Sequence, residues 1–131
     1  MVGMIKRGEV YQIKIIDAIG NEQKGDKWDN RVAVVVSNNQ QNAKEKVIIV
    51  VPLSTSIKKI LPFHVPTFFQ GKPGKAKCEQ IRTLTFERFG KRLGILTSEE
   101  MEEIEDELIM VLNLENYLKK KFKEWLLERN H

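Results

Sequence analysis

The chain has 131 residues, 41% hydrophobic and 31% charged, which is enough to bury one core beneath a well-solvated surface. Its longest apolar runs, such as Val47–Val51, are far shorter than the roughly 20 residues of a membrane-spanning helix. Cys78 is the only cysteine and there are two histidines, which excludes a disulfide-stapled secreted scaffold and a zinc site built from Cys and His alone. We therefore expect a cytoplasmic protein with a single domain over residues 1–131 and no contact with a membrane.

The net charge of +4 understates how unevenly the charges are distributed. The window Ser98–Glu107 holds seven acidic residues and no basic one, and without those seven acids the chain carries +11. A basic body with one acidic patch favours a polyanionic partner, most simply a nucleic acid. The alternative is a lysine-rich surface that only keeps the protein in solution.

The first two-thirds of the chain predicts short strands. Glu9–Ile15, Arg31–Val36 and Val47–Val51 are rich in β-branched residues, and the last two suit strands buried on both faces. The polar stretch Ser37–Asn42 predicts a turn that joins them as a wide hairpin. Prolines 52, 62, 66 and 73 predict that the following strands are short or at edges, and Cys78–Leu84 is expected as a further strand. So many short strands favour a small, strongly curved barrel.

The last third of the chain has helical periodicity. Thr97 is followed three residues later by Glu100, the pattern of a capping box at a helix start. Apolar residues then recur at spacings of three and four, first at Met101, Ile104, Leu108 and Val111, then at Leu114, Leu118, Phe122 and Trp125. The pattern predicts either one helix bent near Asn113 or two helices that meet there. We expect both apolar stripes to face a core or an interface.

Polar side chains at two predicted strand ends could form an anion site. Arg31 opens an apolar run, where its guanidinium could hold a phosphate; a salt bridge to Asp26 or Asp29 is the alternative. Ser54 and Thr55 directly follow another strand, where hydroxyls can bind a phosphate oxygen or simply stabilise a turn. Neither a glycine-rich phosphate loop nor a pair of histidines at metal-ligand spacing is present, so a hydrolase here is expected to use no metal and no cofactor.

Six segments in order resemble the MazF/PemK toxins of type II toxin–antitoxin systems. They are MIKRGEVY from residue 4, GNEQKG from 20, RVAVVVSNN from 31, VIIVVPLSTS from 47, LPFHV from 61 and CEQIRTL from 78. The resemblance covers roughly residues 4–114. It implies a small SH3-like barrel with a C-terminal helix, a homodimer, and a ribosome-independent endoribonuclease that cuts single-stranded RNA without a metal. The products would end in a 2′,3′-cyclic phosphate and a 5′-hydroxyl, and the neutralising partner would be an antitoxin with an acidic, disordered tail.

The resemblance also assigns roles to individual positions. The catalytic arginine falls on Arg31 and the catalytic hydroxyl on Ser54, while Glu22 matches the glutamate of the loop and becomes the candidate base. RNA contacts are expected from the remaining matched or neighbouring polar residues, namely Asn21, Gln23, Thr55, Lys58, Lys59 and His64. His64 has an equal structural alternative as a histidine at a strand edge, and Lys58 and Lys59 as a solvated surface pair.

Two features depart from the family pattern. Residues 26–30 are inserted between the loop and Arg31, and Val32 replaces a proline, so the sequence does not give the RNA sequence that is cut. Residues 115–131 extend beyond the usual end of the family as an additional helix without an inherited role. Two other functions remain open at this point: a barrel that binds RNA without cutting it, and a toxin that poisons a protein such as gyrase, as the CcdB toxins of the same fold do.

Overall fold

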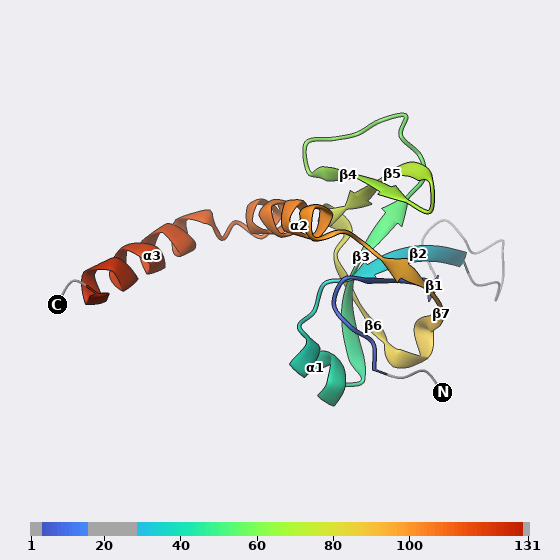
Figure 1. Ribbon diagram of the computed structural model, residues 1–131, viewed down its shortest axis with the longest axis horizontal. Helices are drawn as coiled ribbons and strands as arrows, with labels where there is room; N and C mark the ends of the chain where they lie inside the picture. The colour runs from blue at the N-terminus through green and yellow to red at the C-terminus, as the bar shows by residue number, and fades with distance from the viewer. Residues whose placement is uncertain (1–3, 16–28, 130–131) are drawn as a thin grey trace.

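The computed structural model describes residues 4–15 and 29–129 of the chain. Its strands form one antiparallel sheet in the order β4-β5-β3-β2-β1-β7, with β6 paired to β3 (Figure 1). The strands are β1 (Glu9–Ile15), β2 (Asp29–Val35), β3 (Val47–Ser54), β4 (His64–Phe69), β5 (Lys72–Lys77), β6 (Arg82–Thr85) and β7 (Phe89–Ile95). The helices are α1 (Asn39–Lys44), α2 (Ser98–Val111) and α3 (Glu115–Arg129), with short 3-10 helices η2 (Cys78–Gln80) and η3 (Phe86–Arg88). The predicted mainly β fold with C-terminal helices is confirmed.

The central strands bury side chains on both faces, as their unbroken β-branched runs predict. In β2, Ala33 and Val35 pack into one core cluster with Tyr11 of β1, whereas Val34 packs into a second cluster with Ile104 of α2. All five residues are at most 1% exposed. Because successive side chains of a strand point to opposite faces, the sheet needs a cover on each side, and α2 supplies one of them.

Strand β3 holds two parts of the sheet together. Its first half, Val47–Val50, pairs with β6, and its end pairs with β5 through Leu53 and Ser54. Pro52 lies between these two stretches, which is a place where a residue without an N–H is tolerated inside a strand. This change of partner carries the end of β3 away from β6 and toward the β4–β5 hairpin.

One local prediction is confirmed with an addition, and one was wrong. The stretch Ser37–Asn42 joins β2 and β3 as the predicted wide hairpin, and the connection contains the short helix α1, which Asn38 caps by accepting a hydrogen bond from the Gln41 N–H at 2.8 Å. The stretch Cys78–Leu84 is not one strand: it begins as η2 and becomes β6 only at Arg82. Periodicity alone could not separate these elements, since Cys78 and Leu84 are both buried.

Helix α2 starts as the capping box predicts. The Glu100 N–H donates to Oγ1 of Thr97 at 3.1 Å, and the Thr97 N–H donates back to Oε1 of Glu100 at 3.0 Å. The other carboxylate oxygen of Glu100 accepts from the Phe68 N–H at 2.8 Å, which fastens the edge strand β4 to the helix. One side chain therefore caps α2 and occupies a donor of an edge strand.

The helical region consists of two helices that meet at Asn113. Asn113 has φ 57°, and the Leu114 N–H bonds back to the Ile109 carbonyl at 2.8 Å, which is the Schellman arrangement of a helix end. Asparagine tolerates this left-handed conformation better than most residues, so it fits the position. Helix α3 then runs away from the sheet, and none of its residues is buried (Figure 1). Within the described residues, no helix is long and apolar enough to cross a bilayer.

Candidate functional site

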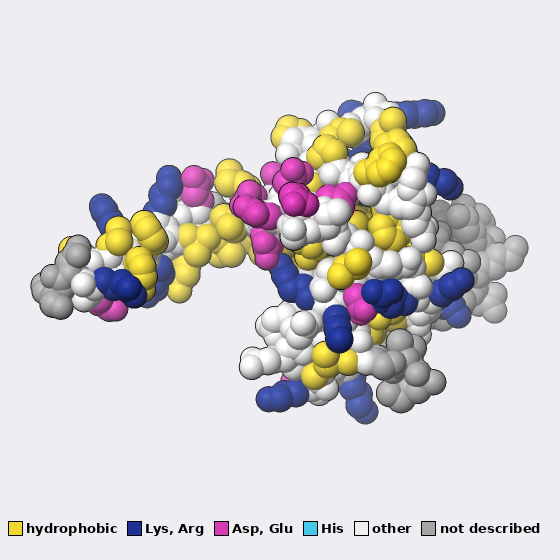
Figure 2. Space-filling view, in the orientation of Figure 1, with side chains coloured by type: hydrophobic (Ala, Val, Ile, Leu, Met, Phe, Trp, Pro, Cys, Tyr) yellow, Lys and Arg dark blue, Asp and Glu magenta, His cyan; other side chains and the backbone are white. Residues whose placement is uncertain are grey.

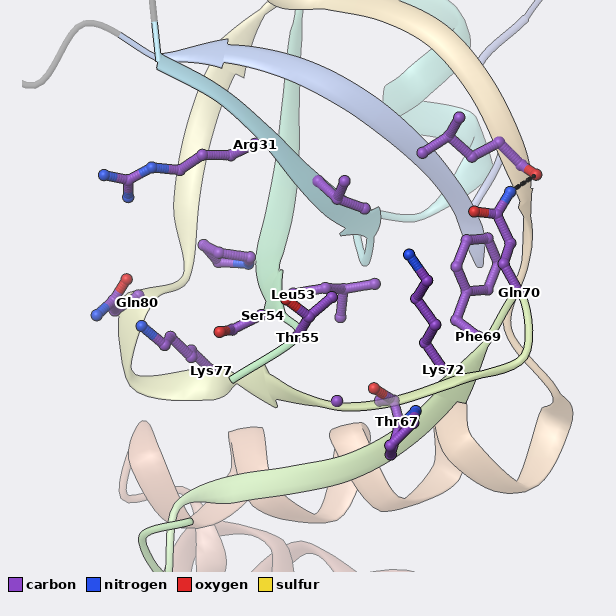
Figure 3. Close-up of a pocket in the computed structure, with 15 residues that line it drawn as sticks. Arg31, Leu53, Ser54, Thr55, Thr67, Phe69, Gln70, Lys72, Lys77 and Gln80 are labelled. Atoms are coloured by element: carbon purple, nitrogen blue, oxygen red, sulfur yellow. Dashed lines mark hydrogen bonds between the residues drawn. The ribbon is translucent and has the colours of Figure 1, made fainter. Parts of the chain in front are cut away.

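A pocket of about 550 Å³ lies where the ends of β2 and β3 approach the β4–β5 hairpin (Figure 3). Its lining comes from six elements or their ends and includes Arg31, Ser54, Thr55, Thr67, Phe69, Gln70, Lys72, Lys77, Gln80 and Leu93. The strand pairing explains the convergence: Val32 of β2 pairs with Leu53 of β3, and Leu53 pairs in turn with Ala76 of β5. Residues far apart in the sequence thus reach one hollow.

The two predicted catalytic residues, Arg31 and Ser54, lie at one end of the pocket. Arg31 is a residue of β2 and Ser54 is the last residue of β3, and both side chains are partly exposed at the pocket. Figure 3 shows Lys77 and Gln80 beside them, brought there by the end of β5 and by η2. A guanidinium, an ammonium, an amide and a hydroxyl at one end of a pocket can together bind the oxygens of a phosphate.

The Ser54 side chain is held in place by its own turn. Its Oγ accepts a hydrogen bond from the Ser56 N–H at 3.1 Å, which fixes the oxygen while the hydroxyl hydrogen stays able to donate. Gly74 of β5 approaches the same residue so closely that a Cβ there would lie 2.4 Å from the Ser54 carbonyl oxygen. Glycine at position 74 is therefore required for β5 to lie against the end of β3.

The opposite end of the pocket is formed by the β4–β5 turn. Gln70 and Gly71 both have positive φ, 53° and 74°, as a two-residue hairpin turn between Phe69 and Lys72 requires. The Gln70 side chain donates to the Leu93 carbonyl of β7 at 3.2 Å, and Figure 3 shows it next to the Phe69 ring. This end offers an aromatic face and an ammonium, a suitable surface for a nucleobase and its phosphate.

The charged side chains that line the pocket are all positive. Arg31, Lys72 and Lys77 contribute three cations, and no aspartate or glutamate is found among the described residues that line the pocket. The acids of the chain gather elsewhere, over α2, as the space-filling view shows (Figure 2). The pocket therefore attracts anions, and the acidic patch does not compete with it.

Some predicted RNA contacts lie in or near this pocket and one does not. Thr55 lines it, whereas Lys58 and Lys59 are exposed in the loop after β3 and are outside its lining. Lys75, 5% exposed, donates from Nζ to the Lys59 carbonyl at 2.6 Å and so ties that loop to β5.

His64 is the predicted contact that the structure places away from the pocket. It is 8% exposed; its Nδ1 accepts from the Leu61 N–H at 3.0 Å and its Nε2 lies 3.3 Å from Glu79 Oε2. Both ring nitrogens are used within the protein, which favours the alternative of a structural histidine at the start of β4 over an RNA contact.

Three of the predicted site residues belong to the loop that precedes β2. Asn21, Glu22 and Gln23 lie outside the described residues, as does the greater part of the insertion at 26–30. The candidate base and the loop contacts therefore remain predictions from the sequence.

Sequence reasoning missed Lys72, Lys77, Gln80 and the aromatic end of the pocket. The expectation of one strand over Cys78–Leu84 does not place Gln80 at the pocket, because η2 gives that side chain its direction. The signal that could have found Lys72 is Gln-Gly at 70–71, a dipeptide suited to a tight hairpin that would bring Lys72 beside Phe69.

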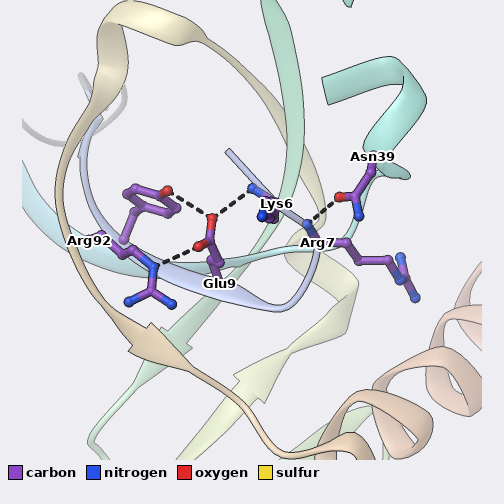
Figure 4. Close-up of polar contacts among 6 residues, drawn as sticks. Lys6, Arg7, Glu9, Asn39 and Arg92 are labelled. Atoms are coloured by element: carbon purple, nitrogen blue, oxygen red, sulfur yellow. Dashed lines mark hydrogen bonds and ion pairs between the residues drawn. The ribbon is translucent and has the colours of Figure 1, made fainter. Parts of the chain in front are cut away.

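A second polar cluster lies around Glu9 and is built from residues that do not line the pocket (Figure 4). The Glu9 carboxylate accepts from the Lys6 N–H at 2.7 Å, from the Tyr11 hydroxyl at 2.9 Å and from Arg92 Nε at 2.6 Å. Burial alone would raise the pKa of Glu9, but the bonds from Arg92, Lys6 and Tyr11 outweigh it and lower that pKa below 4.5. Burial and the adjacent carboxylate raise the pKa of Tyr11 to about 12. These groups satisfy one another, so the cluster is structural.

Neither a reactive thiol nor a metal cluster is found in the described part of the chain. Burial raises the pKa of the Cys78 thiol to about 12, which keeps it neutral and inert, as the sequence predicts for a packed cysteine. The described residues hold no group of three His, Cys, Asp or Glu that could bind a metal ion.

The comparisons with known proteins agree on one family. Residues 6–112 match the family model described as PemK-like, MazF-like toxin of type II toxin-antitoxin system. The chain is 34% identical to endoribonuclease MazF9 of Mycobacterium tuberculosis over 120 residues, covering 85% of this chain and 98% of the relative. It is 31% identical to endoribonuclease MazF of Staphylococcus epidermidis over 119 residues, covering 87% and 96%. The crystal structure of MazF from Deinococcus radiodurans superposes with a TM-score of 0.71 at 18% identity, covering 86% of this chain and 99% of that one, and a MazE–MazF structure from the same organism gives the same values.

Proposed function

Because the chain belongs to the MazF/PemK family of type II toxin–antitoxin endoribonuclease toxins, we propose that its cationic pocket binds and cuts single-stranded RNA. The observation that carries the proposal is the meeting of Arg31 and Ser54, from two neighbouring strands, in a pocket lined by three cations. Arg31, inside β2, and Ser54, at the end of β3, are also the two residues to which the resemblance assigns the catalytic roles.

The reaction proposed is an internal transfer within the RNA. The 2′-hydroxyl oxygen attacks the adjacent phosphorus, the bond from phosphorus to O2′ forms, and the bond from phosphorus to O5′ breaks. The products are a 2′,3′-cyclic phosphate and a 5′-hydroxyl. The nucleophile belongs to the substrate, so DNA cannot replace RNA at the cut.

Each step needs a group of suitable chemistry. Arginine stays protonated at neutral pH, so Arg31 serves to stabilise the charge that develops on the phosphorane and on the leaving O5′. Ser54, fixed by Ser56, orients a non-bridging phosphate oxygen. Glu22 is proposed to take the proton of the 2′-hydroxyl. The leaving O5′ takes a proton from a water molecule, and Glu22 later releases the proton of the 2′-hydroxyl to solvent, so no net proton is consumed. No step in this scheme requires a metal ion, since the guanidinium supplies the positive charge.

The rest of the pocket extends the site along the RNA. Lys77 and Gln80 support the scissile phosphate, and Phe69 with Lys72 fits a neighbouring base and its phosphate. Thr55 borders the reacting group, and Lys58 and Lys59 are proposed as rim contacts that attract the RNA backbone. Asn21 and Gln23 would complete the groove from the loop.

The partners follow from charge and from the family. An acidic antitoxin tail fits the same cationic groove, and the D. radiodurans relative has been solved as a MazE–MazF complex. Both ligands would neutralise the same lysines and arginines, so both should weaken as the salt concentration rises. We also propose the homodimer that the family resemblance implies and a cytoplasmic site of action.

The test is incubation of the purified protein with a long RNA in EDTA, followed by mapping of the cuts by primer extension and analysis of the product ends. We expect discrete cuts with cyclic phosphate and 5′-hydroxyl ends, and no cut where a single 2′-deoxynucleotide stands at a mapped site. Cleavage that stops in EDTA contradicts the metal-free scheme. RNA binding without cleavage, or neither of the two, contradicts the proposed activity.

A further inference from the structure

The turn between β4 and β5 places a glutamine in a backbone conformation that asparagine or glycine adopts more readily. Gln70 has φ 53° and Gly71 has φ 74°, so both turn residues lie in the left-handed region. Two-residue hairpin turns of this kind prefer asparagine at the first position, because few longer side chains tolerate a positive φ. Such strain beside a pocket indicates a function for the side chain.

The Gln70 side chain is fixed at the wall of the pocket. Its Nε2 donates to the Leu93 carbonyl oxygen at 3.2 Å, and both residues line the hollow. Figure 3 shows the amide oxygen of Gln70 directed into the hollow, next to the Phe69 ring and on the side of the Lys72 ammonium. Because Leu93 holds the nitrogen, the amide cannot exchange the places of its nitrogen and its oxygen. The oxygen is therefore a hydrogen-bond acceptor in a fixed position.

Phe69 supplies an aromatic surface beside this acceptor. A Cβ added at Gly94 of β7 would lie 3.1 Å from two atoms of the Phe69 ring, so the ring packs closely against the backbone of β7. The residue is half-buried and lines the pocket. An aromatic ring that is held in place at a pocket wall is a surface on which a nucleobase can stack.

Gln70 and Lys72 together select among the four bases by hydrogen bonding. The Gln70 oxygen accepts a hydrogen bond, and the Lys72 ammonium only donates. A base that satisfies both groups needs an N–H next to a carbonyl oxygen. Guanine has this pattern, with N1–H and the N2 amino group beside O6, and lysine commonly binds guanine at O6 and N7.

The other bases match these two side chains less well. Adenine and cytosine carry an amino group where guanine has O6 and uracil has O4, and an ammonium repels the amino hydrogens. Uracil offers the Gln70 oxygen one N–H where guanine offers N1–H and the N2 amino group, and its single ring covers less of Phe69. Guanine is therefore the base that this end of the pocket fits best.

We propose that Gln70 is a specificity-determining residue, which selects a guanine that stacks on Phe69 and is bound by Lys72. The inference rests on the proposed binding of single-stranded RNA and adds the identity of one base, on the side of the β4–β5 turn from the phosphate that Arg31 and Ser54 bind. The three N–H groups of the Lys72 ammonium allow it to contact this base as well as the adjoining phosphate.

The direct test is binding of single-stranded oligomers that the proposed reaction cannot cut. The full-length protein is titrated, with fluorescence anisotropy as the readout, against labelled deoxyuridine oligomers that carry one central guanine, adenine or cytosine, or none. We expect the guanine oligomer to bind at least about fivefold more tightly than the other three, since a matched base contact discriminates by at least that factor. Equal affinity for all four, a preference for another base, or no binding to any of them overturns the proposal.

A matched pair of variants in the same turn checks that the Gln70 amide is responsible. Gln70→Gly removes the amide and relieves the positive φ, so the fold should be kept. Gly71→Asn changes the other turn residue, where an added Cβ meets nothing within 4 Å, and leaves Gln70 in place. We expect Gln70→Gly to bind the four oligomers nearly equally and Gly71→Asn to keep the guanine preference, with urea unfolding showing that both variants are folded.

The ratio of affinities between bases separates a specificity role from a structural one. If the bond from Gln70 to Leu93 only stabilised the turn, its loss would change the unfolding midpoint or the affinity for all four oligomers and would leave the ratio unchanged. A guanine preference that Gln70→Gly keeps, or that both variants lose equally, contradicts the proposal.

Mapping of cuts on a long RNA separates this proposal from the proposed nuclease activity. We expect a guanine at one fixed position relative to the wild-type cuts, and no preferred base at that position in the cuts made by Gln70→Gly. Cuts at the same sites by both proteins would overturn the base assignment and leave the nuclease activity standing. A protein that prefers the guanine oligomer but cuts no RNA would contradict the nuclease activity and leave the base assignment standing.

Discussion

The pocket and the Glu9 cluster contain similar groups and use them differently. Each combines an arginine with a hydroxyl, yet the Glu9 carboxylate takes three donors from its own chain, whereas Arg31 and Ser54 line a hollow of about 550 Å³. Polar groups that satisfy one another stabilise a fold, and polar groups that border an open, charged hollow can act on a ligand. The comparison predicts that substitutions in the two places change different measurements.

The largest effect is expected from Arg31→Ala. Loss of one preorganised donor to the charge of a transition state typically lowers the rate about 10²- to 10³-fold. Arg31 is the third residue of β2, and its side chain belongs to neither core cluster, so the thermal unfolding midpoint should stay close to that of the wild type. Single-turnover cleavage of a mapped RNA measures the effect; cleavage at the wild-type rate would remove Arg31 from the site.

Gly74→Ala should damage the pocket without touching any of its polar side chains. The added Cβ would lie 2.4 Å from the Ser54 carbonyl oxygen, so the end of β3 or β5 must shift. Since a displacement of about 1 Å can cost on the order of 10²-fold in rate, we expect a loss of at least tenfold in cleavage. Gly71→Ala is the comparison at a position with open space, where only the positive φ is disfavoured; equal cleavage by both variants would argue against the close approach.

Glu9→Gln should affect stability and not cleavage. Hydrogen bonds to a charged group contribute roughly 1.5–3 kcal/mol each, so loss of this carboxylate should lower the free energy of unfolding by about 1–3 kcal/mol. Because folding lowers the pKa of Glu9 below 4.5, the carboxylate's contribution is complete above that value and is lost as the pH falls through the lower folded-state pKa. Urea unfolding between pH 3 and 7 should therefore show the wild type losing stability in acid more steeply than the variant; parallel curves would contradict this assignment.

Among the substitutions in the pocket, Ser54→Ala should have the smallest effect on the reaction. The hydroxyl orients an oxygen and does not carry charge, and Thr55 lines the same pocket and can partly replace it. We expect about a fivefold fall in cleavage, in keeping with the roughly 1 kcal/mol of a neutral hydrogen bond. The double variant Ser54→Ala, Thr55→Val should fall further. If the double variant cleaved RNA at the same rate as Ser54→Ala, Thr55 would not help to orient the phosphate oxygen.

The strands and helices were largely predictable because their residues carry the pattern locally. The β-branched runs of β2 and β3 and the capping box at Thr97 need no knowledge of the rest of the chain. Asn113 marked the break between helices, although the sequence alone left a bend or two helices open. The η2 turn was not predictable, since a buried Cys78 suits a strand as well as a 3-10 helix.

The site was predictable only in part, and for a physical reason. Arg31 and Ser54 are marked by their positions at strand ends, but Lys72 and Gln80 reach the pocket through a hairpin and a turn whose geometry is tertiary. His64 shows the opposite case: its segment matches the family, while its ring contacts Leu61 and Glu79 within the protein. A residue type at a matching position predicts chemistry only when the fold leaves it open to a ligand.

Two arginine variants test most directly whether the pocket acts on RNA while the Glu9 cluster stabilises the fold. Cleavage rate and unfolding midpoint are measured on the same preparations of Arg31→Ala and Arg92→Ala, with cleavage assayed well below the midpoint. We predict that Arg31→Ala loses cleavage by about 10²- to 10³-fold with an unchanged midpoint, while Arg92→Ala keeps cleavage and unfolds at a lower temperature. If Arg92→Ala lost cleavage as Arg31→Ala did, or Arg31→Ala lowered the midpoint as Arg92→Ala did, the division between the two regions would be contradicted.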